Sequence, residues 1–276
     1  MRHPTNLPLK ELMCALVLLL SLGLQACAPA ATQPAPASAP APAANAIEPK
    51  AIAVLEAACA RLATAQTMSF TAVNTYQKAA RNGQPLFYTT LNRVSMQRPD
   101  KLRVITPGDG VGDEFYFDGK IMMAFVPSAD LVAIDEAPAT IDDLVEKLWQ
   151  KSATYYPFAD VITSDPCAVL KKNMTSAFYV GRSGVVGGTT TDMIALAGPN
   201  IQAEMWIGTQ DQLPRMIKVT YPNEPGRALY QTEYSNWRIN LTHPPGHFTS
   251  AKAANAKRMP FQPPGPPGEA MAPPMR

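Results

Sequence analysis

The spacing of apolar residues predicts one helix followed by a long series of strands. Ile52, Leu55, Cys59 and Leu62 recur at intervals of three, four and three residues, which places one apolar stripe of a helix against the core. After Thr67 the pattern changes to that of strands. These are predicted at 71–76, 86–96, 102–105, 114–117, 121–126, 131–134, 174–180, 185–196, 201–207, 213–220 and 229–237.

Turn residues separate several of these strands. Asn82-Gly83 and Asp118-Gly119 each lie between two extended segments. Such pairs favour tight hairpins because both turn residues adopt positive φ. Gly187-Gly188 and Gly198-Pro199-Asn200 punctuate the later strands in the same way.

A second helix is predicted after residue 139. Thr140 is suited to cap it, and Asp142 and Asp143 suit its positive end. Its apolar face consists of Ile141, Leu144, Val145 and Leu148. Residues 155–172 are interpreted as short helical turns.

These elements predict a mainly β protein of the α+β class. Ten or eleven antiparallel strands with two helical elements imply a strongly curved sheet, and its apolar concave face has to be covered. The two amphipathic helices are the candidates for that cover.

The first 26 residues have the pattern of a secretory signal. Arg2 and Lys10 precede an apolar run from Leu12 to Leu24, which is too short to span a bilayer. The run ends in Leu24-Gln25-Ala26-Cys27, which resembles the lipobox of bacterial lipoproteins, where the cysteine thiol is lipidated. The alternative is an ordinary signal peptide with an incidental cysteine.

If the resemblance holds, the protein is anchored in the cell envelope through acyl chains on Cys27. Ala28, in place of aspartate, implies export to the outer membrane, with the protein facing the periplasm. Residues 27–46 are expected to form an extended tether, because the segment 28–46 holds five prolines and ten alanines. The folded domain is expected at 47–258, and the Pro-rich tail 259–276 is expected to be disordered.

Charge excludes one class of partner. Removal of residues 1–26 takes away Arg2, Lys10 and Glu11, which leaves 22 basic and 21 acidic residues. A net charge of +1 argues against nucleic acid as a partner and against general electrostatic binding to anionic lipid.

Two cysteines remain in the folded part. Cys59 and Cys167 either pair in an oxidising compartment or stay as two separate buried thiols. Since the chain has no CxxC motif and few histidines, no metal site is expected.

Several motifs occur in a recognisable order. Gln97-Arg98-Pro99-Asp100-Lys101-Leu102-Arg103 is followed by Glu114-Phe115-Tyr116-Phe117-Asp118-Gly119-Lys120, then Met205-Trp206-Ile207, Leu213-Pro214-Arg215-Met216-Ile217 and a strand that ends at Trp237. The series covers nearly all of residues 50–260. It resembles the LolA/LolB-like superfamily of periplasmic lipoprotein carriers, and more closely an uncharacterised branch of predicted periplasmic proteins within it.

The resemblance implies a half-open antiparallel β-barrel, covered by helices, with an apolar cavity for acyl chains. Arg98 stands where the carriers place an arginine that hydrogen-bonds the lid and is displaced when lipid enters. The alternative is a surface arginine at a strand end. We find no protruding loop with a lone exposed leucine, which the acceptor type of this superfamily uses to insert its cargo.

No catalytic site can be assembled from the sequence. His243 and His247 have the spacing of metal ligands on a helix, but Pro244, Pro245 and Gly246 forbid that helix. Gly181-Arg182-Ser183-Gly184-Val185 lacks the second glycine of a nucleophile elbow. We therefore expect a protein that is not an enzyme and has no cofactor.

An apolar interior remains as the candidate site. The candidate ligand-binding residues are Arg98, Met96, Phe115, Phe117, Met123, Phe125 and Trp206. Methionine and aromatic residues suit a cavity for varied acyl chains, and they suit ordinary core packing equally.

Two functions stay open at this point. The first is non-catalytic binding of acyl chains or lipoproteins, with the helix over 140–149 opening above the concave face. The second is an envelope scaffold or sensor with a filled core, which binds a protein partner through its surface or its Pro-rich tail.

Overall fold

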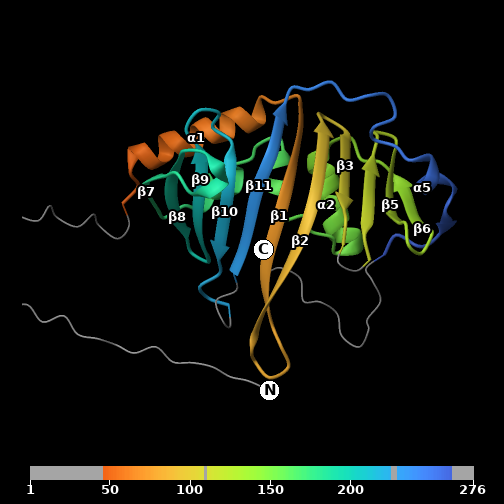
Figure 1. The fold of residues 1–276 in the computed structure, drawn as a ribbon, viewed down its shortest axis with the longest axis horizontal. Coiled ribbons are helices and arrows are strands. Elements are labelled where there is room, and N and C mark those ends of the chain that lie inside the picture. The colour runs from red at the N-terminus through yellow and green to blue at the C-terminus, as the bar shows by residue number, and fades with distance from the viewer. Residues whose placement is uncertain (1–45, 109–110, 225–228, 263–276) are drawn as a thin grey trace, which may run out of the picture. The chain divides into compact units, whose positions relative to one another are not determined.

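The computed structural model describes residues 46–108, 111–224 and 229–262. The predicted signal peptide, Cys27, the tether up to residue 45 and the tail from residue 263 lie outside the described residues. Within them, twelve strands form one sheet in the order β12-β6-β5-β4-β3-β2-β1-β11-β10-β9-β8-β7 (Figure 1). The end strands β12 and β7 do not pair with each other, so the sheet is open. This confirms the mainly β, half-open fold.

Most predicted elements are found close to their expected positions. The strands are β1 (Thr67–Ala79), β2 (Pro85–Gln97), β3 (Lys101–Thr106), β4 (Asp113–Phe117), β5 (Ile121–Val126), β6 (Leu131–Glu136), β7 (Ser176–Ser183), β8 (Thr191–Gly198), β9 (Ile201–Gly208), β10 (Pro214–Thr220), β11 (Leu229–Ile239) and β12 (Lys257–Arg258). The helices are α1 (Pro49–Ala63), α2 (Ile141–Ser152), α3 (Ala159–Ile162), α4 (Ala168–Asn173) and α5 (Ala251–Asn255).

The strand predicted at 185–196 is wrong in its first part. Val186–Gly188 form a short 3₁₀ turn, η1, and β8 begins only at Thr191. Gly187 and Gly188 both have positive φ, 71° and 63°, which is incompatible with a continuous strand.

The central pair of the sheet joins the two ends of the domain. β1 pairs with β11 from Met68 opposite Ile239 to Tyr76 opposite Tyr230. β1 also forms a long hairpin with β2, from Thr67 opposite Gln97 to Ala79 opposite Pro85.

The hairpin protrudes beyond its neighbours. β3 pairs with β2 only from Gln97 to Arg93, so the end of the hairpin has no strand beside it there (Figure 1). Leu86, Phe87 and Tyr88 on this end are 37%, 59% and 47% exposed. Leu86 lies on a strand beside two exposed aromatic residues, so it is not the lone leucine of a protruding loop that the acceptor type uses.

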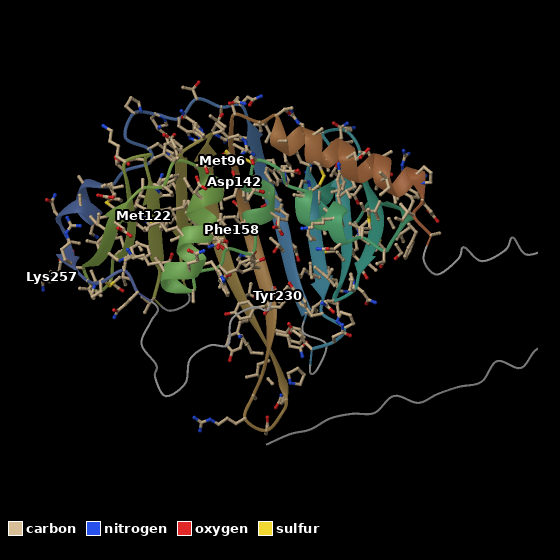
Figure 2. The ribbon with its side chains drawn as sticks, turned by 180° about the vertical axis from the view of Figure 1, so that it is seen from behind. Met96, Met122, Asp142, Phe158, Tyr230 and Lys257 are labelled. Carbon is tan, nitrogen blue, oxygen red and sulfur yellow. A yellow bond between two sulfur atoms is a disulfide. The ribbon has the colours of Figure 1, made fainter. Side chains whose placement is uncertain are left out.

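Helices cover the concave face of the sheet, as expected (Figure 2). Thr140 caps α2 and accepts a hydrogen bond from the Asp143 backbone nitrogen at 3.1 Å. The inward face of α2 consists of Ile141, Leu144, Leu148 and Ser152, all buried. α1 buries Leu55, Cys59 and Leu62 in the same way at the other end of the sheet.

The core is divided by the two faces of the sheet. One cluster lies beneath α2 and α3 and includes Met96, Phe117, Leu144 and Phe158. A second lies beneath α1 and includes Leu55, Ile194 and Met205. A third lies on the opposite face of β4–β6, where Tyr116, Met123, Phe125 and Val132 pack against α5. Along β4 and β5, strand alternation assigns successive residues to the first and third clusters.

The last described residues close the edge of β6. β12 pairs with β6 in parallel, with Lys257 opposite Leu131, and the Met259 nitrogen donates to the Val132 carbonyl at 2.9 Å. Phe261 packs against the core cluster beneath α2. The packed chain thus continues past residue 258, where the sequence pattern placed the end of the domain.

Candidate ligand-binding site

Arg98 fastens two helical segments to the end of β2. Its Nε donates to the Ala65 carbonyl at 3.1 Å, and its Nη2 donates to the carbonyls of Thr163 at 2.8 Å and Leu62 at 3.4 Å. The side chain is half-buried, and this loss of solvent lowers the pKa of the guanidinium, while Asp142 opposes that shift. Arg98 therefore bridges the end of α1 and the end of α3, unlike a free surface arginine.

α2 is attached to the segment that follows α3 through the side chain of Asp142. The Asp142 carboxylate accepts hydrogen bonds from the Ser164 backbone nitrogen and hydroxyl, both at 3.0 Å. Arg98 makes none of its described hydrogen bonds to α2. The segment it holds directly is the one that follows α3.

Of the predicted ligand-binding residues, Phe115 and Phe125 line one cavity, and the others line neither of the two cavities found on the sheet. Met96, Phe115 and Phe117 lie together in the cluster beneath α2. Met123 and Phe125 face the other side of the sheet, against α5. Strand alternation turns Trp206 away from Met205 and Ile207, which pack in the cluster beneath α1. The sequence pattern identified buried residues but not the face on which each one lies.

Below the apolar core, the concave face of the sheet becomes polar. Thr232 Oγ1 donates to Asn74 Oδ1 at 3.0 Å, Asn74 Nδ2 donates to Asn92 Oδ1 at 2.6 Å, and Asn92 Nδ2 donates to Thr106 Oγ1 at 2.9 Å. This polar row crosses β11, β1, β2 and β3. Asn74, Asn92 and Thr232 are buried, and each uses its polar groups within the row, so the row costs little to bury.

A row of tyrosines lies on the same face, two residues beyond the polar row along β1 and β11. Tyr76 on β1 lies directly opposite Tyr88 on β2 and Tyr230 on β11. The ring of Tyr76 stacks on both, with centroid distances of 5.7 Å and 6.3 Å, and Tyr221 meets Tyr230 edge-on at 5.7 Å. Figure 2 shows Tyr230 toward the end of the sheet from which the hairpin protrudes, far from Met96.

Two cavities open on this part of the concave face. The larger cavity, about 360 Å³, lies between β2–β6 and the end of α2, and the segment 259–262 forms part of its wall. Its apolar lining includes Phe115, Ala124, Leu148 and Tyr156. Its polar lining includes Asn92, Thr106 and Asp113.

The smaller cavity, about 110 Å³, lies beneath α3 and α4. Its floor is apolar, with Met205, Ile217 and Val219, and its sides carry Asp160 and four tyrosines, Tyr155, Tyr221, Tyr230 and Tyr234. Burial raises the pKa of the Tyr221 hydroxyl, whereas Asp160 and Tyr155 are exposed residues of the lining.

Tyr155 and Pro157 line both cavities and form the partition between them. The backbone here is held from below, because Tyr156 packs against Phe115 and Phe158 at centroid distances of 6.1 Å and 5.1 Å. Tyr155 points outward and is 46% exposed. Of the two residues that line both cavities, Tyr155 is the more exposed.

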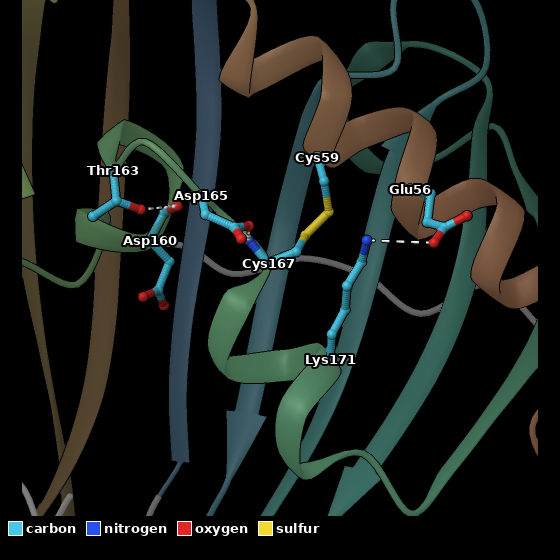
Figure 3. The surroundings of a disulfide bond; sticks show 7 residues. All are labelled: Glu56, Cys59, Asp160, Thr163, Asp165, Cys167 and Lys171. Carbon is cyan, nitrogen blue, oxygen red and sulfur yellow. Dashed lines mark hydrogen bonds and ion pairs between the residues drawn. A yellow bond between two sulfur atoms is a disulfide. The ribbon is translucent and has the colours of Figure 1, made fainter. Parts of the chain in front are cut away.

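A disulfide fixes the wall of the smaller cavity. Cys59 on α1 bonds to Cys167, directly before α4, with a Cα–Cα distance of 5.9 Å (Figure 3). Lys171 on α4 also pairs with Glu56 on α1 at 3.3 Å. Of the two alternatives for the cysteines, the pair is found and the two separate thiols are not.

His243 and His247 face each other in the loop after β11. Their rings stack at 4.5 Å with an interplanar angle of 18°, and Phe248 meets both edge-on. Burial, His243 and Arg103 together lower the pKa of His247 to about 4. Within the described residues, no group of three or more histidine, cysteine or acidic side chains is placed to hold a metal ion.

Comparison with known proteins identifies the family of this chain. A protein-family model described as a predicted periplasmic protein, DUF2092, matches residues 51–262. The match spans most of the chain, which therefore belongs to the DUF2092 family of predicted periplasmic proteins. No curated protein matches the sequence. In the described part of the chain, no helix is long and apolar enough to cross a membrane.

Solved structures with a similar fold come from several bacteria. LprF from Mycobacterium bovis is 13% identical over 72% of this chain and 98% of that chain, with a TM-score of 0.44. The complex of MucA and MucB from Pseudomonas aeruginosa is 18% identical over 73% of this chain and 61% of that chain, with a TM-score of 0.42. A LolA superfamily protein from Nitrosomonas europaea is 13% identical over 72% of this chain and 97% of that chain, with a TM-score of 0.33. At these identities and scores, the likeness says nothing about what this chain binds.

Proposed function

We propose that the protein is an envelope lipoprotein, anchored through Cys27, that binds an acyl chain without catalysis. The observation that carries the proposal is the pair of neighbouring cavities, whose linings share Tyr155 and Pro157. Cavities that hold small ligands have volumes of about 300–1,000 Å³, and the larger cavity lies at the lower end of that range. Each acyl methylene removed from water contributes about 0.8 kcal/mol.

The proposed way in is rotation of Tyr155, not opening of α2. Ile141, Leu144 and Leu148 are at most 2% exposed, so lifting α2 would expose a packed core. Tyr155 is exposed, and its rotation joins the larger and smaller cavities without breaking a described hydrogen bond. An acyl chain then lies along the polar and tyrosine rows, beside the core beneath α2.

A scaffold or sensor is the second candidate. The filled core beneath α2 favours it, since Met96, Phe117 and Leu144 leave no exposed side chain there. The exposed Leu86, Phe87 and Tyr88 on the hairpin supply a surface for a protein partner. In this case neither cavity takes up lipid.

Native mass spectrometry of the exported chain, with Cys27 replaced by alanine to remove anchor lipid, tests the proposal. We expect adducts of acyl-chain mass that dissociate on activation. Ala124→Phe, which fills the larger cavity, is expected to abolish them. Ala195→Phe is the matched control, because Ala195 lies on β8 outside both cavity linings. A bare mass for the unfilled protein, with no uptake of an apolar fluorescent probe, favours the scaffold.

A further inference from the structure

All the charged side chains that line the two cavities are acidic. Asp113 and Glu114 line the larger cavity and Asp160 lines the smaller one, whereas the linings contain no lysine, arginine or histidine. A ligand whose acyl chain ends in a carboxylate or phosphate therefore meets repulsion at both cavities. A ligand with a positive charge meets attraction.

Asp160 is the acidic residue that lines the smaller cavity. It lies on α3, and among the described residues no donor bonds to its carboxylate. Figure 3 shows the Asp160 carboxylate directed away from the disulfide, whereas Asp165, five residues later, turns toward Cys167 and accepts a hydrogen bond from its backbone nitrogen at 3.2 Å. Asp160 thus belongs to the cavity, and Asp165 belongs to the turn before α4.

Four tyrosines line the smaller cavity together with Asp160. Tyr230 and Tyr234 come from β11, Tyr221 follows β10, and Tyr155 follows α2. Tyr155, Tyr221 and Tyr234 line the same cavity as Asp160, whose charge contributes to raising the pKa of their hydroxyls. Aromatic rings beside a carboxylate are the arrangement that recognises ammonium groups.

Other aromatic rings of the chain are paired with its own cations. Lys50 Nζ lies 3.3 Å from the ring centre of Tyr179, and Arg103 lies 5.7 Å from that of Tyr116. No such cation–ring pair is found for the four tyrosines of the smaller cavity within the described residues. The described residues therefore place no cation of the chain against these rings.

We infer that the smaller cavity binds the ammonium group of a cationic amphiphile, held by Asp160 and the four tyrosines, while the acyl chain of the same molecule passes Tyr155 into the larger cavity; the assignment rests on the proposed function. The volume of about 110 Å³ suits a small substituted ammonium group. The protein then selects its ligand by the charge of the head group as well as by the chain.

Three probes with one alkyl chain and different heads test this selection. Isothermal titration calorimetry of the full chain carrying Cys27→Ala compares decyltrimethylammonium, decyl maltoside and decyl sulfate, each below its micellar concentration. We expect the cationic probe to bind about tenfold more tightly than the neutral one, and the sulfate to bind most weakly. Asp160→Asn is expected to remove the preference and to leave decyl maltoside unchanged. Asp165→Asn, with the same loss of charge, is expected to retain the preference.

The outcomes separate the two proposals. Equal binding of all three probes overturns the ammonium site and leaves the acyl cavity standing, whereas binding of none overturns both. A preference that survives Asp160→Asn also overturns the site. If the Asp160→Asn variant does not fold, a competition experiment on the protein that retains Asp160 replaces it. We expect tetramethylammonium chloride to displace bound decyltrimethylammonium more than sodium chloride does. Equal displacement by the two salts overturns the site.

Discussion

At the scale of single residues, Arg98 has the clearest structural role. Its guanidinium donates to carbonyls at the ends of two helical segments, which no other side chain of similar length replaces, because lysine lacks the planar fork. Arg98 thus joins the ends of α1 and α3 to the end of β2, whereas α2 is joined to β6 by the ion pairs of Lys147 and Lys151 with Asp135.

Arg98→Leu is expected to lower the free energy of unfolding by about 1.5–3 kcal/mol, because the carbonyls of Ala65 and Thr163 lose a charged donor. Denaturant unfolding measures the loss. Arg93→Leu is the matched control, since Arg93 lies on β2 and is exposed, and a change of about 0.5 kcal/mol or less is expected for it. Equal effects of the two changes contradict the role of Arg98. Faster exchange of a bound lipid probe in Arg98→Leu connects that role to the cavities.

The stacked histidines give the domain a dependence on pH. The pKa of His247 in the folded protein is about 4, below the value near 6.5 of an unfolded chain. The unfolded state therefore binds more protons between these values. Stability from the neutral ring is complete above about pH 6.5 and is lost as the pH falls toward 4.

His247→Gln is expected to reduce this loss. Denaturant titration from about pH 7 to about pH 4.5 measures the unfolding free energy of the unmodified protein and of the variant. We expect the difference between the two to shrink as the pH falls. A constant difference contradicts the role of His247. An NMR titration of the ring protons, with a midpoint near 4, checks the pKa directly.

At the scale of elements, the disulfide between α1 and the start of α4 determines the wall of the smaller cavity. Its two cysteines are 108 residues apart in sequence. Closing a loop of this length removes much of the conformational freedom of the unfolded chain.

Replacing Cys59 and Cys167 together by alanine is expected to lower the free energy of unfolding by about 4–5 kcal/mol, on loop-closure entropy. Thermal unfolding with and without a reductant measures the effect. The unmodified protein has to lose stability when reduced, and the double variant has to be insensitive to the reductant. Insensitivity of both shows that the bond does not form in the exported protein.

Elements with a strong local pattern could be predicted from the sequence, and those that depend on distant pairing could not. Thr140 and the apolar stripe after it locate α2 to within a few residues. α5 is short and buries only Ala253, and β12 has two residues that exist as a strand only because β6 lies beside them. No local periodicity marks either one.

The candidate site shows the same limit. Tyr76, Tyr88 and Tyr230 form one row only through the register of β1 with β2 and β11, which brings together residues more than a hundred positions apart. Asp160 lies on a single helical turn and has no motif around it. By contrast, the order of motifs from Gln97 to Trp237 was enough to predict the family and the half-open fold.

At the scale of the whole molecule, the anchor and the domain are separate predictions. The family assignment covers 51–262 and describes periplasmic proteins. The lipobox at Leu24–Cys27 lies outside that range and outside the described residues.

Cys27→Ala is expected to move the protein from the membrane fraction to the soluble periplasmic fraction, because acyl chains on the cysteine are its proposed attachment. Fractionation of a double-membraned bacterium, with labelled palmitate, measures this. Cys14→Ala, which alters only the predicted signal, is expected to leave both the label and the membrane location unchanged. A Cys27→Ala protein that keeps the label contradicts the assignment of the lipidated residue.

The pairing of β1 with β11 has a consequence for secretion. A chain that crosses the inner membrane as an unfolded thread, amino end first, delivers β1 long before β11, whose pairing residues extend to Ile239. Until then the edge of β1 has no partner, and the two halves of the sheet cannot be joined across it. The central pair of the sheet therefore forms only when almost all of the domain has arrived outside.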